Sequence, residues 1–328
     1  MEKNRDGDRN RNKIVLPSSS NSKKELSVKS MIKYVNKRNI FFIFLSVVAV
    51  GMGYIPLRDL LTSPAHTEYY SHIMLIPLVS GYFIYSARKT IFADLRYSYT
   101  IGIPLFIIGV LLYALGWYQG HQLNQNDYTS LMTFSVIIFW IGAFILFYGA
   151  QAFQSAIFPL LFLVFMIPIP SVLMEKSISV LVAGSTATTY MLFHLTGIPF
   201  LQEGSVFHLP GMTIEVAKQC SGIRSSLGLF ITGILAGHLF LKSGWRKVIL
   251  ALVVFPITVF KNGIRITTLS ALAIYVDEKF ITQGFLHKSG GFIFFIPALL
   301  LLGLGLWWLK KTEKSSLLNE ENIKGKEW

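Results

Sequence analysis

The sequence contains few charged residues and only one cysteine, and both shortages exclude whole classes of protein. Asp, Glu, Lys and Arg make up 14% of the 328 residues, against about 25% in a typical soluble domain. The single cysteine, Cys220, excludes an intramolecular disulfide, a CxxC redox pair and a cysteine-rich metal site. The patterns HExxH, GxSxG and GxxxxGK[ST] are absent as well. We therefore expect no metal site and no cofactor.

Apolar residues are correspondingly abundant, at 52% of the chain, and the mean hydropathy is +0.53. A bilayer is crossed by a helix of about 20 apolar residues. Eight runs reach or approach that length: 39–57, 73–87, 99–117, 131–150, 156–170, 221–241, 246–260 and 292–309. The sequence therefore predicts an all-α polytopic membrane protein with about eight transmembrane helices.

The net charge of +13 does not indicate a nucleic-acid partner, because the basic residues lie in tails and short loops. Twenty-two of the 30 Lys and Arg residues fall within 1–39, 87–98, 242–247 and the stretch from Lys310 onward. Basic residues near membrane ends favour the cytoplasm. We expect residues 1–38 to form a disordered basic cytoplasmic tail, 39–309 the membrane domain, and 310–328 a charged cytoplasmic tail.

Two further segments decide the topology. Segment 172–198 is apolar but contains Glu175, Lys176 and several Ser and Thr residues, and 264–285 holds only a short apolar stretch. If neither crosses, the chain has eight spans, both termini are cytoplasmic, and both segments lie in the outer interface or re-enter from it. If both cross, there are ten spans and Cys220 moves to the inner side. We favour eight spans and leave the alternative open.

A polar stretch at 199–218 separates the apolar runs. Its alternating pattern on either side of Pro210-Gly211 predicts two short strands joined by a turn. In the eight-span topology these strands form a small extracytoplasmic loop resembling a β-hairpin.

Cys220 opens the sequence Cys-Ser-Gly-Ile-Arg, where the polar loop gives way to an apolar helix. A helix N-terminus favours a thiolate over a thiol, and Arg224, four residues further on, adds a permanent cation on the same face. Ser221 and Gly222 complete this turn. The alternative is that Cys220 is a small apolar residue packed at a helix start.

Two polar positions downstream complete a candidate nucleophilic site. Arg265 follows Asn262-Gly263, which we expect to break the helix and aim the guanidinium at an oxyanion. His287 lies at a membrane edge and has the chemistry of a proton shuttle, although an interfacial role is the simpler interpretation. His72, at another helix start, is a weaker candidate for the lining of the site.

The ordered set of these motifs resembles the exosortase/archaeosortase family. It comprises Cys-Ser-Gly-Ile-Arg at 220–224, Asn262-x-x-Arg265-Ile, and His287 followed by Gly-Gly-Phe. Upstream, Tyr70-Ser71-His72 and the Pro-x-Pro segment at 162–170 are similar to earlier parts of the family pattern. The resemblance runs from about residue 40 to residue 309. Ile73 departs from it, because the family has glycine there.

The resemblance implies a membrane cysteine peptidase or transpeptidase in which Cys220, Arg265 and His287 are catalytic and Arg224, Asn262, Ser221 and His72 are supporting residues. It also implies partners: exported membrane proteins that end in a sorting signal made of a short motif, a transmembrane helix and a basic tail. The cleaved protein would pass to a surface polysaccharide, a lipid or water. The expected location is the cytoplasmic membrane, with the site facing outward.

Two alternatives use the same residues differently. Buried arginines and interrupted segments also occur along the substrate paths of transporters and channels. A scaffold protein of a polysaccharide export system would need none of the catalytic chemistry. The reactivity of Cys220 separates these interpretations, because only the enzyme requires an activated thiol.

Overall fold

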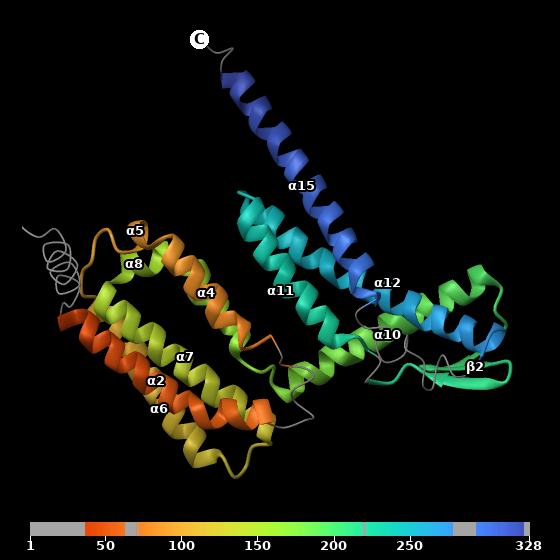
Figure 1. Cartoon of the computed structure of the whole chain (residues 1–328), viewed down its shortest axis with the longest axis horizontal. Coiled ribbons are helices and arrows are strands. Elements are labelled where there is room, and N and C mark those ends of the chain that lie inside the picture. Colours follow the sequence, from red (N-terminus) through yellow and green to blue (C-terminus); the bar gives the residue numbers. More distant parts are fainter. Residues whose placement is uncertain (1–36, 63–69, 71, 219–220, 278–292, 325–328) are drawn as a thin grey trace, which may run out of the picture.

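The computed structural model describes residues 37–62, 70, 72–218, 221–277 and 293–324 (Figure 1). The first half of this part contains α2 (Lys37–Thr62), α4 (Leu75–Ser86), α5 (Arg88–Ile91), α6 (Tyr99–Gln119), α7 (Gln125–Tyr148), α8 (Ala150–Ser155), α9 (Ile157–Phe162) and the 3₁₀-helix η1 (Leu163–Met166). The second half contains α10 (Ser171–Thr196), β1 (Leu201–Glu203), β2 (Val206–Leu209), β3 (Met212–Glu215), α11 (Ile223–Phe240), α12 (Gly244–Tyr275) and α15 (Phe295–Lys324). The charged tail expected at 310–328 therefore continues α15 as far as Lys324, and the tail predicted at 1–38 lies almost entirely outside the described residues.

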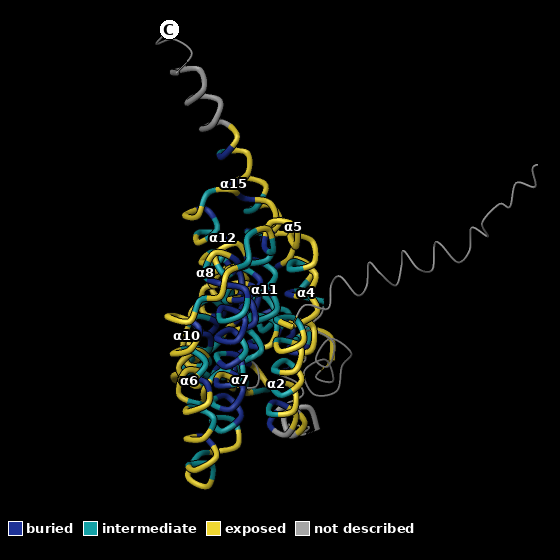
Figure 2. The backbone as a smooth tube through the Cα atoms, turned by 90° about the vertical axis from the view of Figure 1, so that its left-hand side faces the viewer, coloured by how far each residue is buried: buried dark blue, intermediate teal, exposed yellow. Residues whose placement is uncertain are grey.

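Within the described part of the chain, seven helices are long and apolar enough to cross a membrane: α2, α6, α7, α10, α11, α12 and α15. Two shorter apolar helical segments are α4 and the stretch Ile157–Met166. Buried residues concentrate along α7, whereas α2 and α6 carry exposed apolar side chains outward (Figure 2). In a membrane this surface faces lipid. The prediction of an all-α polytopic membrane protein is confirmed.

Helices α6 and α7 pack with their backbones in close contact. A Cβ atom added at Gly109 would lie 2.5 Å from the backbone nitrogen of Phe139, and one added at Gly142 would lie 2.5 Å from that of Phe106. Small residues permit this approach between membrane helices. Helix α2 and the short helices α8 and α9 pack against α7 of this pair.

The basic loops at 87–98 and 242–247 lie at the same end of the bundle, here called the basic end. Phe83, near the end of α4, packs edge-on against His238 in the last turn of α11, with ring centroids 5.5 Å apart. The Lys242 and Ser243 amides, which follow α11, donate hydrogen bonds to the carboxylate of Glu313 in α15. The same carboxylate pairs with Arg246 at 3.4 Å. The shared location of these loops agrees with the grouping of Lys and Arg that the sequence predicts.

The opposite end, here called the far end, holds the starts of α7, α10 and α11. Asp127, in the first turn of α7, accepts a hydrogen bond from the Ser171 amide at 2.6 Å, and Asn126 donates to the Ile169 carbonyl at 2.8 Å. Helix α10 therefore begins at the far end. The middle of α10 packs against α12 beside Gly222, the residue that precedes α11. Because α11 starts at the far end, the middle of α10 is still at the far-end level and not nearer the basic end. The length of α10 suits a span, but these contacts favour the eight-span interpretation.

The expected helix break at Asn262-Gly263 is wrong, because α12 continues unbroken from Gly244 to Tyr275. At 32 residues it is about 48 Å long, well beyond the ~30 Å of a hydrocarbon core. Gly263 has a packing role instead: a Cβ there would lie 2.5 Å from the Thr188 methyl carbon. The glycine permits α10 and α12 to cross closely. The Asn262-Gly263 pair therefore marks a helix crossing and not a helix break.

The predicted hairpin is present and gains a third strand. β2 and β3 are antiparallel, with Leu209 opposite Met212 across the Pro210-Gly211 turn. β1 adds to the other side of β2, which gives the order β1-β2-β3. Phe193 of α10, Phe207 of β2 and Ile266 of α12 belong to one hydrophobic core. The sheet therefore packs against the second halves of both helices.

The crossing of α10 and α12 generates a stability prediction. Ser185 and Asn262 are both fully buried and joined by a hydrogen bond of 2.9 Å, whereas the buried Thr189 hydroxyl has no hydrogen-bond partner among the described residues. We expect Ser185→Ala to cost about 1 kcal/mol because it removes this bond, while Thr189→Val costs less or stabilises. Thermal unfolding midpoints in detergent measure both. Equal losses would contradict a specific role for the Ser185–Asn262 bond.

Candidate functional site

The turn that follows Cys220 is held in a left-handed conformation. Gly222 has φ of +74°, which glycine adopts without strain, and it immediately precedes α11. The Ser221 hydroxyl, fully buried, accepts a hydrogen bond from the Ile223 amide at 3.4 Å. Helix α11 thus begins at Ile223, two residues after the start of the apolar run predicted at 221–241. Cys220 itself lies outside the described residues.

The same turn packs directly against α12. A Cβ atom on Gly222 would lie 3.4 Å from the Asn262 side-chain oxygen and 3.7 Å from the Lys261 ammonium nitrogen. Two sequence segments predicted to cooperate, 220–224 and 262–265, are therefore in contact through their described residues. Gly222 therefore has a packing role between α11 and α12.

Lys261 is a further candidate site residue, which the sequence pattern does not single out. Its side chain is 7% exposed, and its ammonium group donates a hydrogen bond to the Ser225 hydroxyl in the first turn of α11. A lysine at membrane depth costs roughly 2.5 kcal/mol or more, so such residues are usually functional or paired. In the sequence Lys261 directly follows the apolar run 246–260, which is also where a basic residue at the end of a span would lie. The continuous α12 places it inside the helix instead.

Arg265 lies one turn beyond Lys261 on the same face of α12. It is half-buried, and its Nε atom is buried without a hydrogen-bond partner in the described part of the chain. The two positive charges are close enough to repel each other. Such a pair favours a negative charge placed between or beside them, whether carboxylate or oxyanion. This positive face adjoins the turn that follows the cysteine.

The remaining predicted residues are less well supported by the packing. Arg224 is exposed in the first turn of α11. Its predicted position on the same face as Cys220 stays a prediction, because Cys220 lies outside the described residues. His287 lies outside the described residues. Ser221 caps a turn and Asn262 ties α12 to α10, so both have a visible structural role.

His72 precedes α4 at the far end, where Tyr70 donates a hydrogen bond to Asn126. Its neighbours Tyr70 and Ile73 pack against Met166 and Met174. Met174 is eleven residues before Ser185 in α10, which corresponds to about 16 Å along the helix. The described contacts therefore place His72 near the start of α10, and its role in the site stays a prediction.

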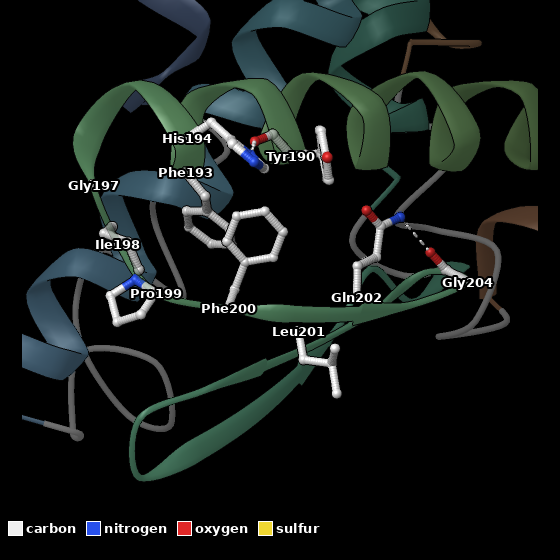
Figure 3. Close-up of a pocket in the computed structure, with 10 residues that line it drawn as sticks. All are labelled: Tyr190, Phe193, His194, Gly197, Ile198, Pro199, Phe200, Leu201, Gln202 and Gly204. Carbon is white, nitrogen blue, oxygen red and sulfur yellow. Dashed lines mark hydrogen bonds between the residues drawn. The ribbon is translucent and has the colours of Figure 1, made fainter.

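A hollow of about 650 Å³ opens between α10 and β1 (Figure 3). Tyr190 and His194 line it from α10, Phe200 rises between the helix and the strand, and Gln202 points into it. Gln202 is held by a 2.8 Å hydrogen bond to the Gly204 carbonyl. Phe193 connects this hollow to the core that contains Ile266, the residue after Arg265.

One of the comparisons with known proteins, that with family models, finds a match. The family model described as "Transmembrane exosortase (Exosortase_EpsH)" matches residues 64–304, which is well over half of the chain. Neither the curated proteins nor the solved structures contain a match. The matched range includes the turn after Cys220, the Lys261–Arg265 face and the sheet. The chain belongs to the transmembrane exosortase family.

Proposed function

We propose that this protein is a membrane cysteine peptidase or transpeptidase that cleaves the C-terminal sorting signal of exported proteins and transfers them to a surface acceptor or to water. The observation that carries the proposal is the contact between the turn after Cys220 and the basic face of α12. It joins the segment of the only thiol to two cations with no acidic partner among the residues described.

The proposed reaction begins with attack of the Cys220 thiolate on the scissile carbonyl carbon. The carbonyl oxygen becomes an oxyanion, which the Arg265 guanidinium stabilises, with the Lys261 charge close by. His287 gives its proton to the leaving amine, and a thioester remains on Cys220. An amine, a hydroxyl or water then attacks the thioester, His287 takes up its proton, and the thiolate is restored.

The position of these residues suits a substrate anchored in the membrane. We place the far end outward, because the basic end holds the Lys- and Arg-rich loops and would face the cytoplasm. The Lys261–Arg265 face lies beside the start of α11, at the far end of the bundle. A sorting signal whose helix crosses the bilayer would present its cleavage motif at this level. The enzyme would then act in the cytoplasmic membrane on its outer side.

The hollow beside β1 offers a place for the extended motif. β1 pairs with β2 on one edge only, so its other edge is unpaired among the described strands, and the hollow lies over the face from which Phe200 and Gln202 project (Figure 3). Glu203 and Val206 are the last pair before a two-residue turn, and such a pair is hydrogen-bonded. Because main-chain groups alternate between the two edges of a strand, the amide and carbonyl of Gln202, one residue earlier, point to the free edge of β1. A peptide in extended conformation would add there as a fourth strand.

The first prediction concerns the nucleophile. Cys220→Ala is expected to abolish cleavage of a co-expressed exported protein that ends in a short motif, an apolar helix and a basic tail, because no thioester can form. The immunoblot mass of that protein is the measurement, and equal membrane accumulation of both enzyme forms is the control. Unchanged cleavage by Cys220→Ala would exclude the cysteine mechanism and favour a transport or scaffold role.

The second prediction concerns Lys261. Lys261→Met keeps much of the side chain's length and removes its charge, so we expect cleavage to fall about tenfold or more. The alkylation of Cys220 by iodoacetamide at neutral pH should slow as well, because a nearby cation favours the thiolate. Lys247→Met, at the start of the same helix and at the basic end, is the matched control.

Lys261→Arg should restore part of both rates, because it returns the charge with a different shape. If Lys261→Met and Lys247→Met alkylate and cleave at the same rate, Lys261 has no part in the reaction. Cleavage that is lost together with folding, detected as a lower unfolding midpoint, would assign Lys261 a structural role.

A further inference from the structure

A pocket of about 460 Å³ lies at the basic end, between the end of α11 and α15. Helix α15 continues past the end of α11 here (Figure 1). Two aromatic rings, one carboxylate and four lysines line the pocket, and the lysines are Lys242, Lys310, Lys311 and Lys314. None of the lining residues belongs to the proposed catalytic site, which lies at the far end.

The lining of this pocket carries a net positive charge. Its carboxylate, Glu313, is buried and already accepts hydrogen bonds from the Lys242 and Ser243 amides and pairs with the Arg246 guanidinium. Four lysines and one glutamate leave the lining three positive charges in excess. The pocket is therefore complementary to an anion.

The aromatic rings hold two of these lysines in place. The Lys310 ammonium lies 5.4 Å from the centre of the Phe240 ring, and the Lys311 ammonium lies 5.2 Å from the centre of the Trp307 ring. An ammonium group has three N–H donors, so one that lies over a ring can still donate to an anion. Lys314 is one helical turn after Lys310 and shares its face of α15. Cations from both helix ends thus surround one space.

The pocket lies where two candidate membrane spans end. The span in α11 ends at Phe240, and the apolar part of α15 ends at Lys314. Trp307 and Trp308 are both exposed just before the lysines of α15. Exposed tryptophans are typical of the boundary between a membrane and water. The lysines therefore lie at the level of the lipid headgroups.

An exposed apolar stripe leads from the pocket toward the middle of the membrane. Leu304 and Leu300 precede Trp307 by three and seven residues, so the three side chains share one face of α15. All three are more than half exposed. A hydrocarbon chain attached to an anion in the pocket would lie along this stripe, whereas a soluble anion would gain nothing from it.

Charge, depth and the apolar stripe together point to one kind of ligand. Basic pockets between membrane helices are suited to the headgroups of anionic lipids. We propose that this pocket binds one anionic phospholipid from the leaflet at the basic end. The phosphate would lie among Lys242, Lys310 and Lys314, with an acyl chain along Trp307, Leu304 and Leu300.

The lysines of the basic end provide matched variants. The pocket variant combines Lys310→Gln with Lys314→Gln. The control combines Lys89→Gln with Lys247→Gln, which removes the same charge from the same end of the molecule but outside the pocket. A third form, Lys310→Arg with Lys314→Arg, keeps the charge in the pocket.

The experiment uses the purified full-length chain in dodecyl maltoside micelles that contain equal amounts of phosphatidylglycerol and phosphatidylcholine. Native mass spectrometry measures which lipid the chain retains. We expect the unmodified chain, the control and the arginine form to retain one phosphatidylglycerol, with a preference of about tenfold or more over phosphatidylcholine. The pocket variant should lose most of that preference. Soluble glycerol phosphate, added at the concentration of the lipid, should not displace the phosphatidylglycerol.

Three outcomes would overturn the proposal. The first is equal retention of both lipids by the unmodified chain. The second is the same loss of preference in the pocket variant and in the control, which would assign it to overall charge. The third is displacement by glycerol phosphate, which would show that a soluble phosphate suffices. Unfolding midpoints of all forms show whether a variant is folded, and the arginine form tests the pocket if the glutamine form is not. Lipid retention does not depend on cleavage, so a failure here leaves the proposed catalytic function untouched.

Discussion

The contact between the middle of α12 and the turn before α11 is the constraint on which the candidate site depends. Gly222 lies against Asn262 and Lys261, and the Lys261 ammonium reaches the Ser225 hydroxyl. On the other side of α12, Gly263 lets α10 approach until Ser185 bonds to Asn262. Any movement of α12 would disturb both neighbours at once. The site is therefore built on three packed helices rather than on a loop.

The electrostatics of the molecule divide along the membrane normal. At the basic end, a buried carboxylate, Glu313, satisfies two amides and the Arg246 guanidinium, so the positive charge there is neutralised in part. At the far end, Lys261 and Arg265 lie one turn apart on α12, and the Lys261 ammonium donates to the Ser225 hydroxyl. A membrane protein keeps such an uncompensated pair when a ligand or a transition state supplies the negative charge.

The hollow along β1 and the basic face of α12 are linked by one hydrophobic core. Phe193 of α10 lines the hollow and packs in the same cluster as Ile266, the residue after Arg265. The sheet packs against α10 and α12 through this cluster, so both features depend on the packing of the same two helices.

The sequence by itself determined the class of the protein, the grouping of its basic loops, the hairpin around Pro210-Gly211 and the identity of the family, because these follow from local composition and residue order. It could not determine whether Asn262-Gly263 breaks the helix or lets another helix approach, because a glycine in either role gives the same local sequence pattern. Only the tertiary structure decided that α12 is continuous, which placed Lys261 beside the α11 start. Long-range packing, absent from any local pattern, made that lysine part of the site.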